Sequence, residues 1–204
     1  MKLNELISRA PQLPLSLELE NGQILVVEQW LRVLPEQRYV GKAQWQGRTV
    51  LAKLLIGNKA SRQYQRELAG AQLLTEQKIT SAELLGFQQQ SDGSAYLLFE
   101  FIDNAQSLAA AWQECKSDKP LSERQTVVLG GALSAVAQMH LRGLWQSDLH
   151  LDNLLQQGEQ LYVVDGGGVQ SEQAGQPLSQ EKAIANLAVF FAQLPSAFDN
   201  HLEE

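Results

Sequence analysis

Residues 146–153, with the sequence QSDLHLDN, and residues 163–167, with the sequence VVDGG, are the two stretches that decide the fold. The first stretch places Asp148 and Asn153 five positions apart, and Asp165 follows twelve residues after Asn153. Phosphoryl transfer needs acidic and amide oxygens to hold Mg²⁺, and a separate carboxylate to orient the attacking hydroxyl. A loop with Asp and Asn, followed by a strand that ends in Asp, can direct all three side chains to one point.

The segments around these stretches favour a functional interpretation. Asp and Asn are common in turns, so each stretch alone could be an ordinary loop. However, a helix is predicted over 121–142, with a capping box formed by Ser122 and Gln125 and a C-terminal cap at Gly143. Two short strands, 154–155 and 161–164, then lead to Asp165. The order is capped helix, loop, hairpin and Asp-Gly.

The first half of the chain is predicted to be mostly strands, with one helix over 61–77. Strands are expected at 24–34, 39–45, 49–56, 84–88 and 96–102, and further helices at 108–114 and 179–194. The division between the two halves is expected near 103–105.

Lys53 interrupts the apolar strand 49–56. Burial of a charge is costly unless it is paired, and Glu67 lies fourteen residues later in the predicted helix. A strand lysine paired with a helix glutamate is the arrangement that positions ATP phosphates in kinases. The alternative is an edge-strand lysine that points into solvent.

Taken together, these motifs resemble the protein-kinase-like superfamily, and residues from about 32 to 194 follow its element order. The Asp-x-x-x-x-Asn spacing equals that of the protein-kinase catalytic loop. The resemblance implies a two-lobed α+β fold. Residues 1–103 would form an antiparallel-sheet N-lobe with one helix, which binds nucleotide, and residues 104–204 a reduced, mostly helical C-lobe.

The resemblance also implies roles for individual residues, with ATP and Mg²⁺ as cofactors. Asp148 would be the catalytic carboxylate, and Asn153 and Asp165 would bind Mg²⁺. Lys53 would contact the α- and β-phosphates and would be held by Glu67.

The remaining implied contacts are with the nucleotide. The backbone of Glu100, Phe101 and Ile102 would bind the adenine edge. His150 would either touch the γ-phosphate or brace the loop.

A finer resemblance is to the bacterial lipopolysaccharide core kinases, which act on heptose or octulosonic-acid sugars. It is carried by His150, where protein kinases usually have Lys, by the short chain, and by residues 96–102 and 187–194. It implies phosphorylation of a sugar hydroxyl on a small-molecule or lipid-linked substrate.

Three departures from the kinase pattern matter. Gln146 stands where protein kinases have the first His of the catalytic loop, which weakens the match without removing chemistry. Residues 34–41, LPEQRYVG, lack the G-x-G-x-x-G pattern, and Gly166 stands in place of the Phe of Asp-Phe-Gly. One alternative is therefore a pseudokinase or ATP-binding scaffold, although retention of all five polar site residues argues against it. Another is a small protein kinase or a tRNA-pathway kinase.

Composition limits the partners and the compartment. The formal net charge is −7 and the pI is about 5.0, which disfavours direct, non-specific nucleic-acid binding. Cys115 is the single cysteine, so an intramolecular disulfide is excluded. We expect a cytoplasmic protein without a signal peptide, with peripheral contact at the inner face of the membrane left open; the oligomeric state is not predicted.

Overall fold

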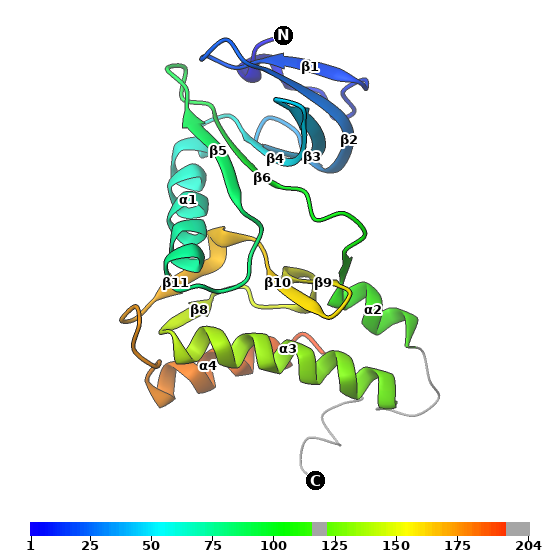
Figure 1. Cartoon of the computed structure of the whole chain (residues 1–204). Coiled ribbons are helices and arrows are strands. Elements are labelled where there is room, and N and C mark those ends of the chain that lie inside the picture. Colours follow the sequence, from blue (N-terminus) through cyan, green and yellow to red (C-terminus); the bar gives the residue numbers. More distant parts are fainter. Residues whose placement is uncertain (116–121, 195–204) are drawn as a thin grey trace. The chain divides into compact units, whose positions relative to one another are not determined.

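The computed structural model describes residues 1–115 and 122–194, and it divides the chain into two compact units (Figure 1). Unit 1 comprises Met1–Ala69 and Ala82–Phe101, and unit 2 comprises Gly70–Ser81 and Ile102–Glu204. Two parts of the expected C-terminal lobe, residues 116–121 and 195–204, lie outside the described residues.

Unit 1 is built on a six-stranded antiparallel sheet with the strand order β1-β2-β3-β4-β6-β5. The strands are β1 (Leu15–Glu18), β2 (Ile24–Leu34), β3 (Arg38–Trp45), β4 (Arg48–Leu55), β5 (Leu84–Gln89) and β6 (Ala95–Glu100). Side chains alternate between the two faces of a strand. In β3, Tyr39 and Ala43 are therefore fully buried in the core of unit 1, whereas Arg38, Val40 and Lys42 face the other way and are half-buried.

An amino-terminal segment covers the core face of this sheet. It contains a short 3₁₀ helix, η1 (Leu3–Glu5), and Leu3 and Leu6 are buried among the core residues of the sheet. The Tyr39 hydroxyl donates a hydrogen bond to the Ser8 carbonyl at 2.8 Å, and burial raises the pKa of this phenol. Trp30 Nε1 donates to the Pro11 carbonyl at 3.2 Å. None of this segment was predicted from the sequence.

Unit 2 is mostly helical and has its own hydrophobic core. Its helices are α2 (Leu108–Glu114), α3 (Glu123–Leu141) and α4 (Gln180–Phe191). Its short strands are β7 (Gln106–Ser107), β8 (Leu144–Gln146), β9 (Leu154–Gln157), β10 (Gln160–Val163) and β11 (Val169–Ser171), and its 3₁₀ helices are η2 (Leu151–Asn153) and η3 (Gly166–Gly168). The sheets have the orders β10-β9-β7 and β11-β8. The core gathers Trp112, Val136, Met139, Leu144 and Phe190.

Helix α1 (Ala60–Glu76) begins in unit 1 and ends in unit 2. Within unit 2, its residue Gly70 lies against the turn that follows β10. A Cβ atom at Gly70 would lie 1.8 Å from the carbonyl oxygen of Gly166. The absence of a side chain at this position therefore permits direct backbone contact between the helix and the turn.

The predicted elements are confirmed with small shifts of their ends. The predicted capping box of α3 is present, because Gln125 N donates to Ser122 Oγ at 3.2 Å and Ser122 N donates to Gln125 Oε1 at 2.9 Å. Gly143 follows the helix with φ +74°, as a C-terminal cap requires. The strand predicted over 96–102 ends earlier, at Glu100. In the described part of the chain, no helix has the length and apolar character needed to cross a membrane.

Candidate functional site

Lys53 and Glu67 form a buried ion pair in unit 1, with 2.7 Å between Lys53 Nζ and Glu67 Oε2. The lysine residue is 7% exposed and the glutamate 4%. Strand β4 lies between β3 and β6, and Lys53 pairs with Val40 on one side and Leu97 on the other. The alternative of a solvent-facing lysine on an edge strand is therefore excluded.

Arg38 approaches the same glutamate. Its Nη1 lies 3.9 Å from Glu67 Oε1, and its side chain is 20% exposed. The sequence analysis missed this residue because it looked for glycines in the loop before β3. Side chains two residues apart on a strand share a face. Arg38 lies two residues before Val40, the cross-strand neighbour of Lys53, so it lies on the same face as that lysine.

The predicted catalytic loop in unit 2 runs from the end of β8 through η2. Asn153 is buried, and its Nδ2 donates to the Asp148 carbonyl at 3.1 Å. This bond uses the amide nitrogen and leaves Oδ1 as the atom that could bind a metal. Val164 N in turn donates to the Asn153 carbonyl at 2.9 Å. A backbone hydrogen bond thus connects the loop to the residue before Asp165.

Gln146 occupies the position of the first His of a protein-kinase catalytic loop, and it is fully buried. Its Nε2 donates to the carbonyls of Val164 and Asp165, at 3.0 and 2.9 Å. The backbone carbonyl of Gln146 accepts a hydrogen bond from Asn186 Nδ2 at 2.7 Å. Asn186 Oδ1 in turn lies 3.0 Å from His140 Nε2. Glutamine therefore supports the backbone next to Asp165. Asn186 was missed by the sequence analysis, although it is the one polar residue in the stretch 183–191 of helix α4.

The turn after β10 begins at Asp165 and places Gly168 against the Asp148 carboxylate. Asp165 adopts a left-handed backbone conformation, with φ 64° and ψ 68°, and the glycines of η3 follow it. A Cβ at Gly168 would lie 1.9 Å from Asp148 Oδ1, and Ser147 N donates to the Gly168 carbonyl at 2.9 Å. A side chain at position 168 would therefore require the Asp148 carboxylate to move.

The residues proposed for Mg²⁺ fit that ion by their chemistry. Among residues 1–115 and 122–194, no group of three or more His, Cys, Asp or Glu forms a complete metal-binding cluster. Mg²⁺ usually binds through one or two protein oxygens together with substrate phosphates and water. An amide oxygen of Asn153 and a carboxylate of Asp165 match that incomplete set.

The remaining predicted residues lie in both units. Glu100 ends β6, and its N–H donates to the Glu83 carbonyl at 2.8 Å. Phe101 follows in unit 1, where Lys42 Nζ lies 4.6 Å from the centre of its ring. Ile102 belongs to unit 2, as does His150. The roles of these residues toward ATP stay predictions.

A pocket of about 420 Å³ lies in unit 2 beside the catalytic loop. His150 and Asp152 line it from the loop, and Trp112 and Gln113 line it from α2. It therefore combines an aromatic ring with polar groups next to residues of the predicted loop.

Comparisons with known proteins bear on the fold. No protein-family model matches the sequence, and no curated protein matches it. Among solved structures, the chain is similar to WaaP in complex with acyl carrier protein, with a TM-score of 0.54 and 19% identity over 80% of this chain and 69% of that chain. It is also similar to vaccinia related kinase 3, with a TM-score of 0.53 and 15% identity over 83% of this chain. The match spans 56% of the length of vaccinia related kinase 3. The chain thus has a protein-kinase-like fold, as the order of its motifs predicted.

Proposed function

We propose that this protein is an ATP-dependent phosphotransferase that uses Mg²⁺ and transfers the γ-phosphoryl group to a hydroxyl. The observation that carries the proposal is the buried Lys53–Glu67 pair, 2.7 Å long, on a protein-kinase-like fold. A cation held in this way loses less side-chain entropy when it binds the phosphates of ATP. The proposal requires unit 1 and unit 2 to act on the same nucleotide.

Unit 2 would supply the groups for the metal and the acceptor. Asn153 and Asp165 would hold Mg²⁺, and the Asp148 carboxylate would orient the attacking hydroxyl and accept its proton. Gln146 would keep the backbone beside Asp165 in place through its two hydrogen bonds. In protein kinases the equivalent parts act mainly by positioning and charge stabilisation.

The acceptor that we propose is a hydroxyl of a lipopolysaccharide core sugar. Support comes from the sequence resemblance to lipopolysaccharide core kinases and from the pocket beside the catalytic loop. That pocket, about 420 Å³, is within the size range of small-molecule sites. Trp112 offers apolar surface for a sugar ring, and the polar groups of His150 and Asp152 suit hydroxyls. A peptide acceptor is less consistent with a pocket of this size.

The proposal is tested by nucleotide binding and transfer measured separately. Mg-ATP should raise the unfolding temperature of the wild-type protein, and Asp165→Ala should lose the Mg²⁺-dependent part of that increase. Asp148→Ala should keep ATP binding but transfer no phosphate to heptose- or octulosonic-acid-containing acceptors, as followed by mass spectrometry. Glu159→Ala, which removes an exposed carboxylate in the turn between β9 and β10, is the matched control.

Three outcomes would contradict parts of the proposal. A wild-type protein that Mg-ATP does not stabilise would exclude the nucleotide site. Binding of ATP without transfer to any acceptor would favour the ATP-binding scaffold. Full transfer by Asp148→Ala would remove that carboxylate from the catalytic role.

A further inference from the structure

The turn between β2 and β3 is too short to surround phosphates with backbone amides. Pro35 and Glu36 are its two central residues, and Gln37 N closes it by donating to the Leu34 carbonyl at 3.1 Å. Proline has no N–H group, and the N–H of Gln37 is already used. The N–H of Glu36 is directed to the Tyr39 hydroxyl oxygen. Nucleotide phosphates would need another donor here.

Arg38 is the first residue of β3, directly after this turn, and its side chain lies on the same sheet face as Lys53. The register shows this, because Arg38 pairs with Leu55 and Val40 pairs with Lys53. Cross-strand partners share a face, and so do residues two apart on a strand. Arg38 and Lys53 are therefore diagonal neighbours on the face opposite the core of unit 1.

The guanidinium of Arg38 carries an unsatisfied donor. Its Nε is buried and has no hydrogen-bond partner. Its Nη1 lies 3.9 Å from Glu67 Oε1, which is beyond hydrogen-bond distance. Buried polar groups without partners are rare in folded proteins, and each requires an explanation. A ligand that accepts hydrogen bonds at this position would provide one.

We propose that Arg38 is a second phosphate-binding residue, whose guanidinium donates to phosphate oxygens of ATP beside Lys53. This inference rests on the proposed function and identifies a residue that the kinase motifs do not assign. The planar guanidinium presents several N–H groups in a geometry that matches phosphate oxygens. Arg38 thereby supplies, from a side chain, the donors that the short turn between β2 and β3 lacks.

The alternative role for Arg38 is structural support of Glu67. The two roles differ in how the effect of a substitution depends on the number of phosphates in the ligand. A phosphate-binding residue contributes nothing to adenosine affinity and increasingly more to AMP, ADP and ATP. A structural residue affects all four ligands by a similar factor, because the whole site is disturbed.

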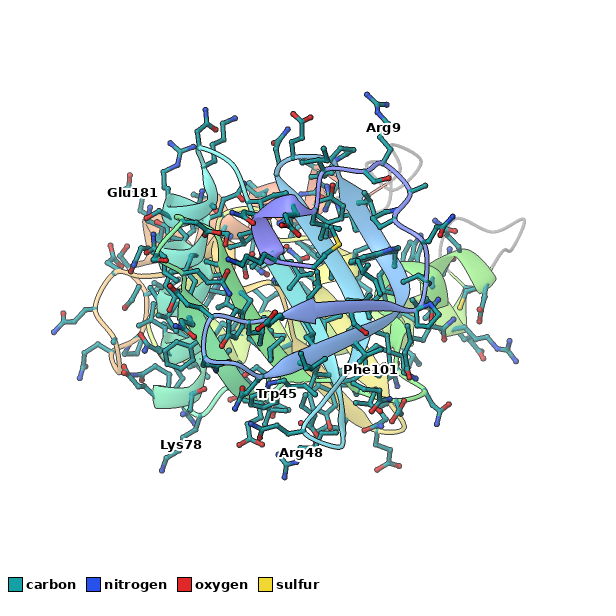
Figure 2. All side chains as sticks on the ribbon, turned by 90° about the horizontal axis from the view of Figure 1, so that it is seen from above. Arg9, Trp45, Arg48, Lys78, Phe101 and Glu181 are labelled. Carbon is teal, nitrogen blue, oxygen red and sulfur yellow. The ribbon has the colours of Figure 1, made fainter. Side chains whose placement is uncertain are left out.

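The test measures dissociation constants for adenosine, AMP, ADP and ATP by isothermal titration calorimetry, with wild-type protein, Arg38→Met and Arg38→Lys. Since a hydrogen bond to a charged group contributes enough to change affinity about 10- to 100-fold, Arg38→Met should weaken ATP binding by that factor. Its affinity for adenosine should stay unchanged, and Arg38→Lys should be intermediate. The control is Arg48→Met at the other end of the β3–β4 hairpin, where the arginine side chain projects away from the protein (Figure 2). It should match the wild type for every ligand.

Other results would contradict either the assignment of Arg38 or the proposed function, and the two cases can be told apart. Unchanged ATP affinity in Arg38→Met, or an equal loss for adenosine and ATP, would overturn the assignment of Arg38. If both Arg38 variants lose adenosine binding, the residue serves the fold, and the assignment is again wrong. If the wild-type protein binds none of the four ligands, the proposed function fails, independently of Arg38.

Discussion

Replacement of Gly70 by alanine probes the contact between α1 and the turn after Asp165. The new Cβ would start 1.8 Å from the Gly166 carbonyl oxygen, whereas observed Cβ contacts essentially never fall below 3.0 Å. The helix or the turn would therefore have to move by about 1.2 Å, and the obstructing atom is backbone. Overpacking of this kind costs about 1–3 kcal/mol, while alanine gains about 0.5–1 kcal/mol over glycine in a helix interior. We expect Gly70→Ala to lower the free energy of unfolding by about 1–2 kcal/mol.

Gly130 provides the matched control for this prediction. It also lies inside a helix, α3, but a Cβ at this position would meet nothing within 4 Å. Gly130→Ala should therefore raise the free energy of unfolding by about 0.5–1 kcal/mol. Urea unfolding followed by tryptophan fluorescence would measure both variants. The reasoning is refuted if the two substitutions change stability in the same direction by similar amounts.

Three further predictions concern the loop and the turns of unit 2. A Cβ at position 168 would lie 1.9 Å from Asp148 Oδ1, so Gly168→Ala should displace the Asp148 carboxylate and lower turnover by about 100-fold or more while ATP affinity stays near the wild-type value. Unchanged turnover would contradict the catalytic role proposed for the Asp148 carboxylate. Gly143→Ala places a Cβ on a residue with φ +74°, at 2.2 and 2.4 Å from two carbonyl oxygens in the loop before α4. The free energy of unfolding, measured by heat or urea, should fall by about 2–4 kcal/mol. Stability equal to the wild type would be inconsistent with that backbone geometry. Hydrogen bonds from the N-cap serine of α4 lower the pKa of Glu172, so its stabilising effect is present above the ordinary carboxyl pKa and is lost as the pH falls through the lowered value. The stability difference between wild type and Glu172→Gln should accordingly be present at pH 7 and disappear in strongly acidic buffer, and a difference that does not vary with pH would argue against this linkage.

The order of elements and the polar residues of the site could be predicted because each leaves a local signal. The Lys53 charge interrupts an apolar strand, and the Ser122–Gln125 box marks the start of α3. The spacing of Asp148 and Asn153 is likewise a property of one loop. These signals need no knowledge of which segments meet in space, and the fold that they implied agrees with the structural neighbours.

The features that could not be predicted depend on contacts between segments that are distant in the sequence. Arg38 is significant because of the register that β3 forms with β4. Asn186 becomes part of the site through its bond to the Gln146 carbonyl, forty residues away. The strands β8 and β11 have three residues each, too few for a period of two to be recognised. In the sequence, Gly70 is only a residue of low helix propensity within a predicted helix. Its contact with the Gly166 carbonyl is apparent only in the structure.

The division of α1 between the units is another such feature. The continuous helical pattern of residues 61–77 offers no reason to separate Glu67 from Gly70. In the structure Glu67 pairs with Lys53 in unit 1, whereas Gly70 contacts Gly166 in unit 2. These two residues are three positions apart and lie on neighbouring parts of one helical surface. Their different partners are therefore visible only in the folded chain.

The amino-terminal segment has a practical consequence for how the protein is produced. A gene trimmed to begin near Arg32, where the kinase-like motifs begin, would delete Leu3, Leu6, strand β1 and most of strand β2. The apolar face around Tyr39 would then meet water, and the shortened protein would be prone to aggregate in the expression host. Failure of such a fragment to bind nucleotide would report on the missing cover and not on the catalytic residues.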